Sequence, residues 1–364
     1  MLKEFPMSGR AVHFMGVGTI GEPLVHLFLT HKTELGVDEI TFHKNSPKST
    51  DRGKLTQLLK AGAKLVCDEN KVGDFTQLGF TPSLTTEEAV RRASVVIDST
   101  PSGTGLEYKA KLYSRYDDGT RGFLAQGSEA GFGHPYAYGI NDETLPSLNS
   151  RFIHIVSCNT HALSVLIKTI AGTPDGLQVP HLEQGTFVCL RRASDVGEKK
   201  GISSPELGTH KDKKFGTHHA KDAHDLYLTK GIDVPIYSSA VKFNTQYMHT
   251  IWFHLRLKEP VTLSQIKQRI VENPQLSVTE KSTTSEVFQF GRDNGFRGRI
   301  LNQAVIPLHT LSVSEGGKDV IGYAFTPQDG NSLVSSVAAT MWFLHGSGYK
   351  DRVKILERYY LREI

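Results

Sequence analysis

Cysteine is scarce in this sequence, and the scarcity excludes disulfide-rich and zinc-knuckle proteins. The 364 residues contain three cysteines, Cys67, Cys158 and Cys189, at wide and unequal spacing. They form neither a closed disulfide framework nor a cysteine metal site, so any chemistry they carry is that of a single thiol. The histidines near position 218 have Asp222 and Asp225 as their nearest acidic partners, and this spacing fits no strong metal site. We expect no metal.

Long apolar runs are also missing. No stretch approaches the roughly 18 uninterrupted apolar residues of a membrane-spanning helix, and the N-terminal segment MLKEFPMSGR lacks the apolar centre of a signal peptide. We therefore expect no contact with a membrane, no export, and a cytoplasmic protein.

Charge of one sign does not accumulate anywhere in the chain. Lys and Arg number 42 against 38 Asp and Glu, a net charge of +4 that is spread along the sequence. A nucleic-acid-binding protein concentrates basic residues, so we expect no nucleic-acid partner. The pI of about 8.7 is compatible with an anionic small molecule.

The chain is long enough for about two domains of roughly 150 residues each. In its first part, short apolar segments alternate with helix-like segments, which predicts an α/β fold with a parallel, doubly wound sheet. The expected strands are 11–15, 39–42, 94–97, 122–125 and 152–156, and the expected crossover helices are 55–63 and 85–93.

After about residue 180 the sequence is rich in β-branched and aromatic residues, with one clear amphipathic helix at 263–273. This pattern predicts a second, α+β domain with a mainly antiparallel sheet. We place the N-terminal domain at 1–157 and the second domain at 158–326, with a C-terminal helix within 327–364 packing back onto the first.

A glycine motif, Gly16-x-Gly18-x-x-Gly21, follows the first expected strand and opens a helix. Gly16 permits the tight turn, Gly18 lets a pyrophosphate approach the backbone, and Gly21 lets the helix pack on the strand. In this context the motif is typical of a Rossmann dinucleotide-binding domain. An ordinary turn is the less favoured alternative.

The end of the second expected strand bears on the choice of dinucleotide. A fold that selects NAD normally offers Asp or Glu there for the ribose 2′-hydroxyl, whereas this chain reads Phe42-His43-Lys44-Asn45-Ser46. Lys44 suits the 2′-phosphate of NADP, so NADP is expected. NAD stays possible, because Asp38 and Glu39 lie at the other end of the strand.

Cys158 lies where the expected strand 152–156 passes into a helix. A helix N-terminus stabilises a thiolate, which lowers the thiol pKa and predicts a nucleophile near neutral pH. The alternative is that Cys158 is a small buried hydrophobic residue. Cys67 and Cys189 fall inside strand-like apolar runs and are expected to be structural.

A polar stretch between Asp195 and Asp225 contains six lysines and four histidines. Long irregular segments in compact domains are usually functional or mobile. His218 and His219, together with Arg192, offer donors that can hold a phosphate group. The alternative is a solvated basic loop.

Several motifs, taken in order, give the chain a resemblance to a known family. They are Gly16–Gly21, Asp98–Gly103, Ala125–Gly127, Phe152–Thr160, Arg191–Asp195, Gly216–His219 with Asp222, Met248-His249, Ser282–Ser285 and Gln328-Asp329. With these motifs, from about residue 11 to 345, the chain resembles the archaeal-type (class II) glyceraldehyde-3-phosphate dehydrogenases.

The resemblance implies a Rossmann domain followed by a catalytic domain, a homotetramer, and reversible oxidation of an aldehyde phosphate with inorganic phosphate and NAD or NADP, in glycolysis or gluconeogenesis. Carried over to matching positions, it implies cofactor contacts from Thr19, Ile20, Gly127, Arg192 and Gln328. It implies substrate contacts from Ser157, Cys158, Asn159, Thr160, Arg192, His218 and His219.

One departure from the family pattern concerns the general base. The family reads Met-His-x-His and uses the second histidine as the base, but this chain has Met248-His249-Thr250-Ile251. His249 shares a strand face with position 251 but lies about 6.6 Å along the strand. His161, one helical turn after Cys158, would lie within about 5 to 6 Å of the thiol.

Three outcomes therefore stay open at this point: His161 compensates, His249 acts on a shifted substrate, or the usual activity is lost. For His161 the unremarkable alternative is a histidine on the helix surface. The expected function is a phosphorylating glyceraldehyde-3-phosphate dehydrogenase. A related aldehyde dehydrogenase or acyl reductase with another substrate is the alternative that Ile251 and Ala162 favour, and a nucleotide-binding homologue without turnover is a further one.

Overall fold

The computed structural model describes residues 9–116, 122–127, 129–173, 178–194, 202, 204–245, 247–327 and 329–364. The chain divides into two compact units. The first comprises Met1–His134, Pro146–Ile155 and Ser335–Ile355, and the second comprises Pro135–Leu145, Val156–Val334 and Leu356–Ile364.

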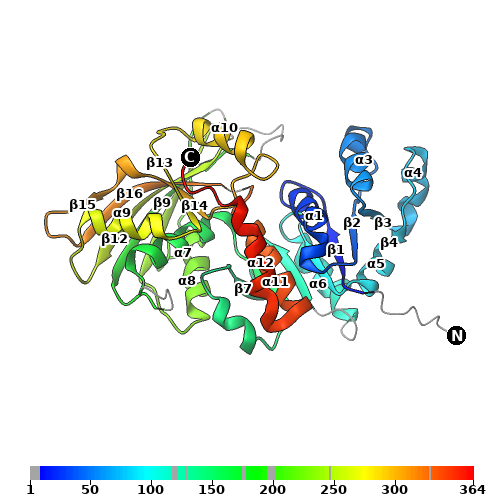
Figure 1. Ribbon diagram of the computed structural model, residues 1–364, viewed down its shortest axis with the longest axis horizontal. Helices are drawn as coiled ribbons and strands as arrows, with labels where there is room; N and C mark the ends of the chain where they lie inside the picture. Colours follow the sequence, from blue (N-terminus) through cyan, green and yellow to red (C-terminus); the bar gives the residue numbers. More distant parts are fainter. Residues whose placement is uncertain are drawn as a thin grey trace. The chain divides into compact units, whose positions relative to one another are not determined.

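The first unit is built on a parallel sheet in the order β4-β3-β2-β1-β5-β6-β8-β7 (Figure 1). Its strands are β1 Ala11–Met15, β2 Glu39–His43, β3 Lys64–Cys67, β4 Leu84–Thr85, β5 Val95–Asp98, β6 Gly122–Gln126, β7 His134–Tyr136 and β8 Phe152–Ile155. The central strands β1 and β5 are buried throughout, because helices cover both faces of such a sheet. The predicted strands and the doubly wound order are confirmed.

Helices connect most of these strands, and two more helices from the C-terminal part of the chain accompany them. They are α1 Gly21–Thr30, α2 Lys32–Leu35, α3 Arg52–Lys60, α4 Val72–Gln77, α5 Thr86–Arg92, α6 Thr104–Lys111, α11 Leu333–His345 and α12 Tyr349–Val353. Thr85 and Glu88 form a capping box that fixes the start of α5. Within the first unit, Ser336 of α11 hydrogen-bonds Gln126 of β6 at 2.9 Å, which ties the C-terminal helix to the sheet.

The second unit contains a mixed sheet in the order β10-β11-β9-β12-β16-β14-β13, with β15 beside β16. Its strands are β9 Leu182–Arg192, β10 Glu206–Leu207, β11 Ile236–Phe243, β12 His249–Leu257, β13 Leu276–Thr279, β14 Ala304–Pro307, β15 Ser312–Val313 and β16 Asp319–Thr326. The pairs β9–β11 and β13–β14 are parallel and the other pairs are antiparallel, so the prediction of a mainly antiparallel sheet is confirmed.

Four helices accompany this sheet: α7 Cys158–Ala171, α8 His218–Leu228, α9 Leu263–Glu272 and α10 Thr284–Asn294. Helix α7 lies against the sheet and contacts both α8 and α9 (Figure 1). Nearly all of its residues are buried, so it forms the centre of the core of the second unit.

Helix α8 corrects the expectation of an irregular stretch up to Asp225. The stretch is polar in composition, but Ala220, Ala223, Leu226 and Tyr227 recur at helical spacing and are buried against the core. The polar residues between them interrupt the apolar pattern, so the helix was not predicted from the sequence. Helix α10 was not predicted either.

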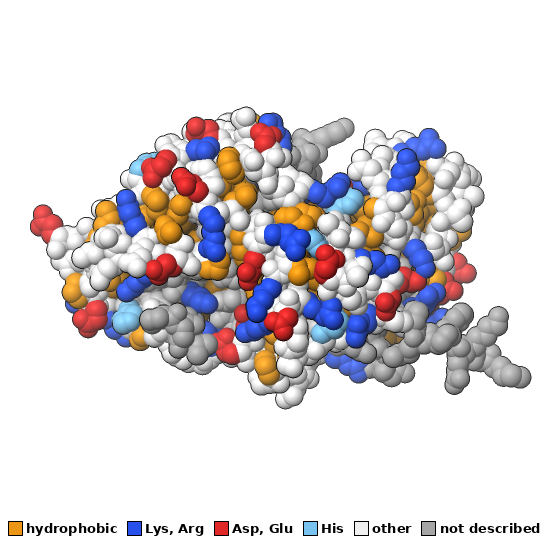
Figure 2. All heavy atoms as spheres, in the orientation of Figure 1, with side chains coloured by type: hydrophobic (Ala, Val, Ile, Leu, Met, Phe, Trp, Pro, Cys, Tyr) orange, Lys and Arg blue, Asp and Glu red, His pale blue; other side chains and the backbone are white. Residues whose placement is uncertain are grey.

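None of the helices in the described part of the chain is long and apolar enough to cross a membrane. On the face shown in Figure 2, basic and acidic side chains are interspersed.

Candidate active site

The glycine-rich turn of the first unit has the geometry of a dinucleotide cradle. Gly16 adopts φ +85°, and a Cβ at Gly21 would lie 2.2 Å from the carbonyl oxygen of Gly16, so both positions require glycine. Gly18 is different, because a Cβ there would meet no atom within 4 Å. That open space above the turn is where a pyrophosphate would approach the backbone, and the residues present therefore fit a dinucleotide.

The turn lies at the switch point of the sheet, where β1 has β2 on one side and β5 on the other. Ligands of doubly wound folds bind in the crevice at this point. The predicted cofactor residues Thr19 and Ile20 belong to the turn, and Ile20 is the N-cap of α1. Gly127 follows β6 with φ +70°, and Gln328 lies outside the described residues.

Lys44 directly follows β2, as predicted, but its ammonium group is not isolated. Its Nζ lies 2.9 Å from a carboxylate oxygen of Asp51. A second lysine, Lys54 of α3, contacts both Glu22 at 2.9 Å and the carbonyl oxygen of Val17 in the glycine turn at 3.2 Å. Lys44 and Lys54 therefore each have an acidic partner, which the spacing of these residues in the sequence did not predict.

Cys158 is the first residue of α7. Ser157 is the N-cap of this helix, and its hydroxyl accepts a hydrogen bond from the backbone N–H of Thr160 at 3.3 Å. The side-chain amide of Asn331 donates to the carbonyl oxygen of Cys158 at 2.9 Å. The backbone on both sides of the thiol is therefore held in place.

The thiol itself differs from the prediction. Burial raises the pKa of Cys158 to about 11, and the charges of Arg192 and Arg191 counteract this only in part. One reason is that the Arg192 guanidinium is already paired with Asp329. The prediction of a lowered thiol pKa is therefore wrong, because desolvation outweighs the arginine charges and the hydrogen bond from the backbone N–H of Asn159.

The N-termini of α7 and α8 meet at the site. The amide of Asn159, the second residue of α7, lies 3.5 Å from Nε2 of His219, the second residue of α8. Farther along, the Tyr227 hydroxyl donates to the carbonyl oxygen of Ser164 at 2.8 Å, so the two helices run side by side. Two helix N-termini at one place favour a negatively charged group there.

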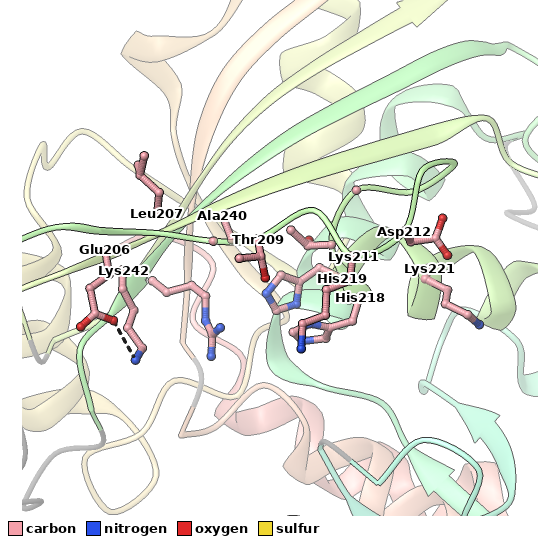
Figure 3. Close-up of a pocket in the computed structure, with 14 residues that line it drawn as sticks. Glu206, Leu207, Thr209, Lys211, Asp212, His218, His219, Lys221, Ala240 and Lys242 are labelled. Carbon is pink, nitrogen blue, oxygen red and sulfur yellow. Dashed lines mark hydrogen bonds and ion pairs between the residues drawn. The ribbon is translucent and has the colours of Figure 1, made fainter.

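His218 and His219 belong to a pocket of about 560 Å³ in the second unit (Figure 3). Its charged lining consists of Arg191, Glu206, Lys211, Asp212, Lys221 and Lys242. The Lys242–Glu206 ion pair, at 3.4 Å, closes one end. No partner of the Arg191 or Lys211 charge is found among the described residues, so the pocket presents unbalanced positive charge.

The alternative of a solvated basic loop fails for His219. This residue is 3% exposed, and the rings of His218 and His219 contact each other with centroids 3.9 Å apart. Burial, followed by the charges of His218, Arg191 and His249, lowers the pKa of His219 well below its usual value. The His218 pKa is lowered as well, mainly by burial.

Arg192 is buried, and its guanidinium is bonded to other groups of the protein. Its Nη2 lies 2.9 Å from a carboxylate oxygen of Asp329, and its Nη1 donates to the carbonyl oxygen of Tyr247 at 3.2 Å. Arg191, the neighbour in β9, lines the pocket instead. Of the two arginines, the geometry favours Arg191 as the contact for an anion.

The three positions named for proton transfer all lie on buried elements. Ile251 is fully buried in the core and pairs with Cys189 across the sheet. His249 is buried, and its Nδ1 accepts the backbone N–H of Arg192 at 2.9 Å. His161 is fully buried, so the alternative of a surface histidine is wrong. Cys67 and Cys189 are buried in strands, as predicted.

Among the described residues, no group of three or more His, Cys, Asp or Glu side chains is arranged to hold a metal ion.

Comparison with known proteins gives relatives along most of the sequence. A glyceraldehyde-3-phosphate dehydrogenase of Metallosphaera sedula is 28% identical over 319 residues, which is 85% of this chain and 85% of that protein. The chain resembles archaeal glyceraldehyde-3-phosphate dehydrogenases. Enzymes of that name from Sulfurisphaera tokodaii and Saccharolobus islandicus are 29% and 28% identical, over 65% and 64% of this chain and 66% of each protein. No protein-family model matches. The resemblance predicted from the motifs is confirmed.

Sequence reasoning assigned no role to three residues of the site: Arg191, Asp329 and Asn331. Arg191 could have been found, because it stands two positions after Cys189 in an alternating strand and so shares its face. Asp329 is 137 positions from Arg192, and Asn331 is 173 from Cys158. No local pattern joins residues so far apart.

Proposed function

We propose that the protein oxidises a small phosphorylated aldehyde, glyceraldehyde 3-phosphate or a close analogue, through a thioester on Cys158. The observation that carries this proposal is the meeting of the α7 and α8 N-termini at Asn159 and His219, beside the thiol and the basic pocket. A nucleophilic thiol next to anion-binding groups is the arrangement that a covalent oxidation of an anionic aldehyde needs.

In this proposal the thiol of Cys158 adds to the aldehyde carbon, and the thiol proton ends on the carbonyl oxygen to give a hemithioacetal. Oxidation of that adduct leaves a thioester, which inorganic phosphate cleaves to an acyl phosphate and the free thiol. The Asn159 side chain and the free N–H groups of α7 are placed to stabilise the negative charge that develops on the oxygen.

Arg191 and His218 are assigned to the phosphate group of the substrate. Arg191 offers a planar set of donors that matches phosphate geometry, and it shares the pocket with His218 at the N-terminus of α8. Ser157 and Thr160 are assigned to holding the first turn of α7, since their hydroxyls lie 2.8 Å apart. Arg192 is assigned to positioning, through Asp329.

A nicotinamide dinucleotide supplies the electron acceptor when it is bound, and NADP is the proposed form. Gly16, Gly18 and Gly21 would hold its pyrophosphate, with Thr19 and Ile20 at the start of α1. Gly127 and Gln328 are proposed to contact it as well. Lys44 is the proposed contact of the 2′-phosphate.

The decisive assay follows cofactor reduction with glyceraldehyde 3-phosphate and phosphate, run with NADP and with NAD. Cys158→Ser should abolish oxidation and leave dinucleotide binding unchanged, because it removes the nucleophile and little volume. Asn159 and the pocket are retained in this variant. Turnover of the serine variant at the wild-type rate would rule out the covalent mechanism.

A second candidate is a homologue that binds the dinucleotide without turnover. The observation in its favour is Ile251, an apolar residue fully buried where the related enzymes carry the base. Binding of dinucleotide, alkylation of Cys158 and no turnover with any phosphorylated aldehyde would establish this candidate. Reduction of either cofactor would exclude it.

A further inference from the structure

The proposed reaction needs a group that takes the proton of the hemithioacetal hydroxyl, and the position of the expected base holds Ile251. An isoleucine side chain carries no proton acceptor. His218 is assigned above to the substrate phosphate. Three other histidines of the second unit are compared as the base: His161 on α7, His219 on α8 and His249 on β12. The hydrogen bonds at their ring nitrogens separate the three.

His249 carries its proton on the wrong nitrogen for a base. The backbone N–H of Arg192 can only donate, so Nδ1 of His249 must accept, at 2.9 Å. The neutral ring then holds its proton on Nε2, and its lone pair is occupied. Burial and the neighbouring arginines lower the pKa of His249 well below its usual value, which keeps the ring in this neutral state. His249 is therefore a hydrogen-bond donor.

His161 faces the core. It is fully buried, and its Nδ1 donates to the carbonyl oxygen of Ser157 at 3.0 Å. It does not line the pocket that contains His218 and His219. Its ring is therefore fully buried and already bonded to the backbone at the start of α7.

His219 combines burial with access to the pocket. It lines the pocket, and its Nδ1 is buried without a hydrogen-bond partner among the described residues. Its other nitrogen, Nε2, faces the amide of Asn159, whose Oδ1 is likewise buried without a partner. The nitrogen and oxygen of an amide exchange places by a half-turn, and this turn lets Oδ1 accept the proton of Nε2.

We propose that His219 is the general base of this protein, with Asn159 as its positioning residue. The Asn159 carboxamide oxygen accepts the Nε2 proton of His219 and so leaves the lone pair on Nδ1, the ring nitrogen without a partner among the described residues. A nucleophile, a base and a third group that orients the base form the usual arrangement for activated thiols. Here the nucleophile and the orienting residue are adjacent in α7, and the base comes from α8.

This proton transfer rests on the proposed function. The O–H bond of the hemithioacetal breaks, its proton goes to Nδ1 of His219, and its electron pair forms the carbonyl of the thioester. The carbon–hydrogen bond breaks, and its hydrogen leaves with both electrons as a hydride, for which the oxidised nicotinamide dinucleotide is the acceptor. The imidazolium returns its proton to water. The charged or titratable groups that act on His219 are His218 on α8, Arg191 on β9 and His249 on β12.

The first test is nuclear magnetic resonance of the dinucleotide-free protein with ¹⁵N-labelled histidine. The expected result for His219, assigned by comparison with His219→Gln, is a protonated Nε2 and an unprotonated Nδ1 at neutral pH. Asn159→Ala should mix the two tautomers. A proton on Nδ1 of His219 in the wild-type protein would overturn the proposal, whether or not the enzyme turns over.

The second test is turnover. His219→Gln should lower the rate by about 10² to 10⁴, the usual contribution of a general base. It should also remove the acid limb below neutral pH, whereas the rise that Cys158 ionisation causes above neutral pH should stay. The matched control is His224→Gln on the same helix, because His224 pairs with Asp233 outside the pocket. This control should keep the wild-type rate and profile.

Alkylation of Cys158 separates this inference from the proposed function. If wild type turns over and His219→Gln keeps both its rate and its acid limb, the inference is wrong while the function holds. If wild type alkylates at Cys158 but never turns over, the proposed function is wrong, and the tautomer measurement alone decides the role of His219. If adding Ile251→His to the His219→Gln variant restores turnover, what that variant had lost is a general base, which supports the inference.

Discussion

At the scale of single residues, Cys158 shows how burial and helix position compete. Burial raises its pKa to about 11, so the fraction of reactive thiolate should grow with pH through the neutral range. We expect the rate of Cys158 alkylation by iodoacetamide to rise about tenfold per pH unit between about pH 7 and pH 9. Mass spectrometry of the modified peptide at several pH values measures this rate.

Cys158→Ser supplies the background for that measurement, because Cys67 and Cys189 remain and burial raises the pKa of both. An alkylation rate that is already constant by about pH 7 would mean that the α7 N-terminus outweighs burial after all.

The ion pair between Lys44 and Asp51 bears on the choice between NADP and NAD. Lys44→Ala should weaken NADP binding by about tenfold, or about 1.4 kcal/mol, and leave NAD binding nearly unchanged, because the 2′-phosphate loses a charged partner. Asp51→Asn should strengthen NADP binding, since it releases Lys44. Calorimetric titration of both dinucleotides at two salt concentrations checks this. Equal affinities that do not respond to either substitution would remove Lys44 from the cofactor site.

At the scale of elements, the turn between β1 and α1 offers a matched pair of glycine substitutions. Gly21→Ala places a methyl group 2.2 Å from the Gly16 carbonyl oxygen, so it should lower both the melting temperature and dinucleotide affinity. Gly18→Ala places the methyl group in open space, so it should keep the melting temperature and lose affinity by at least about tenfold.

Thermal unfolding and dinucleotide titration of both variants check this pair. Unchanged affinity in Gly18→Ala would show that no pyrophosphate approaches this turn.

The elements also show what local patterns can predict. Strands β1, β5 and β6 and helix α7 were predicted because each is a short apolar run bounded by turn residues. Helix α8 was not, because His218, Lys221, Asp222 and Asp225 interrupt its apolar pattern. The partner of His219 across the site could not be predicted, since Asn159 belongs to a different helix 60 positions away.

At the scale of the whole molecule, the resemblance predicted the fold better than it predicted the chemistry. The sheet orders follow from connection rules and from the alternation of strands and helices. Reactivity depends instead on burial and on which charges are already paired, as Arg192 with Asp329 shows. These quantities arise only when distant segments meet, so the high thiol pKa and the separate roles of Arg191 and Arg192 had to come from the structure.

Helix α7 belongs both to the proposed site and to the core of the second unit. In the proposed mechanism its first residues supply the thiol and the amide that orients the base, and the rest of the same helix fills the core of the second unit. A substitution that shifts α7 to suit another substrate would also disturb the packing on which folding depends. Divergence of specificity in such proteins should therefore accumulate in the exposed segment 204–214, whose residues line the pocket but not the core. We therefore expect the sequence of α7 to vary little among related proteins and that of segment 204–214 to vary more.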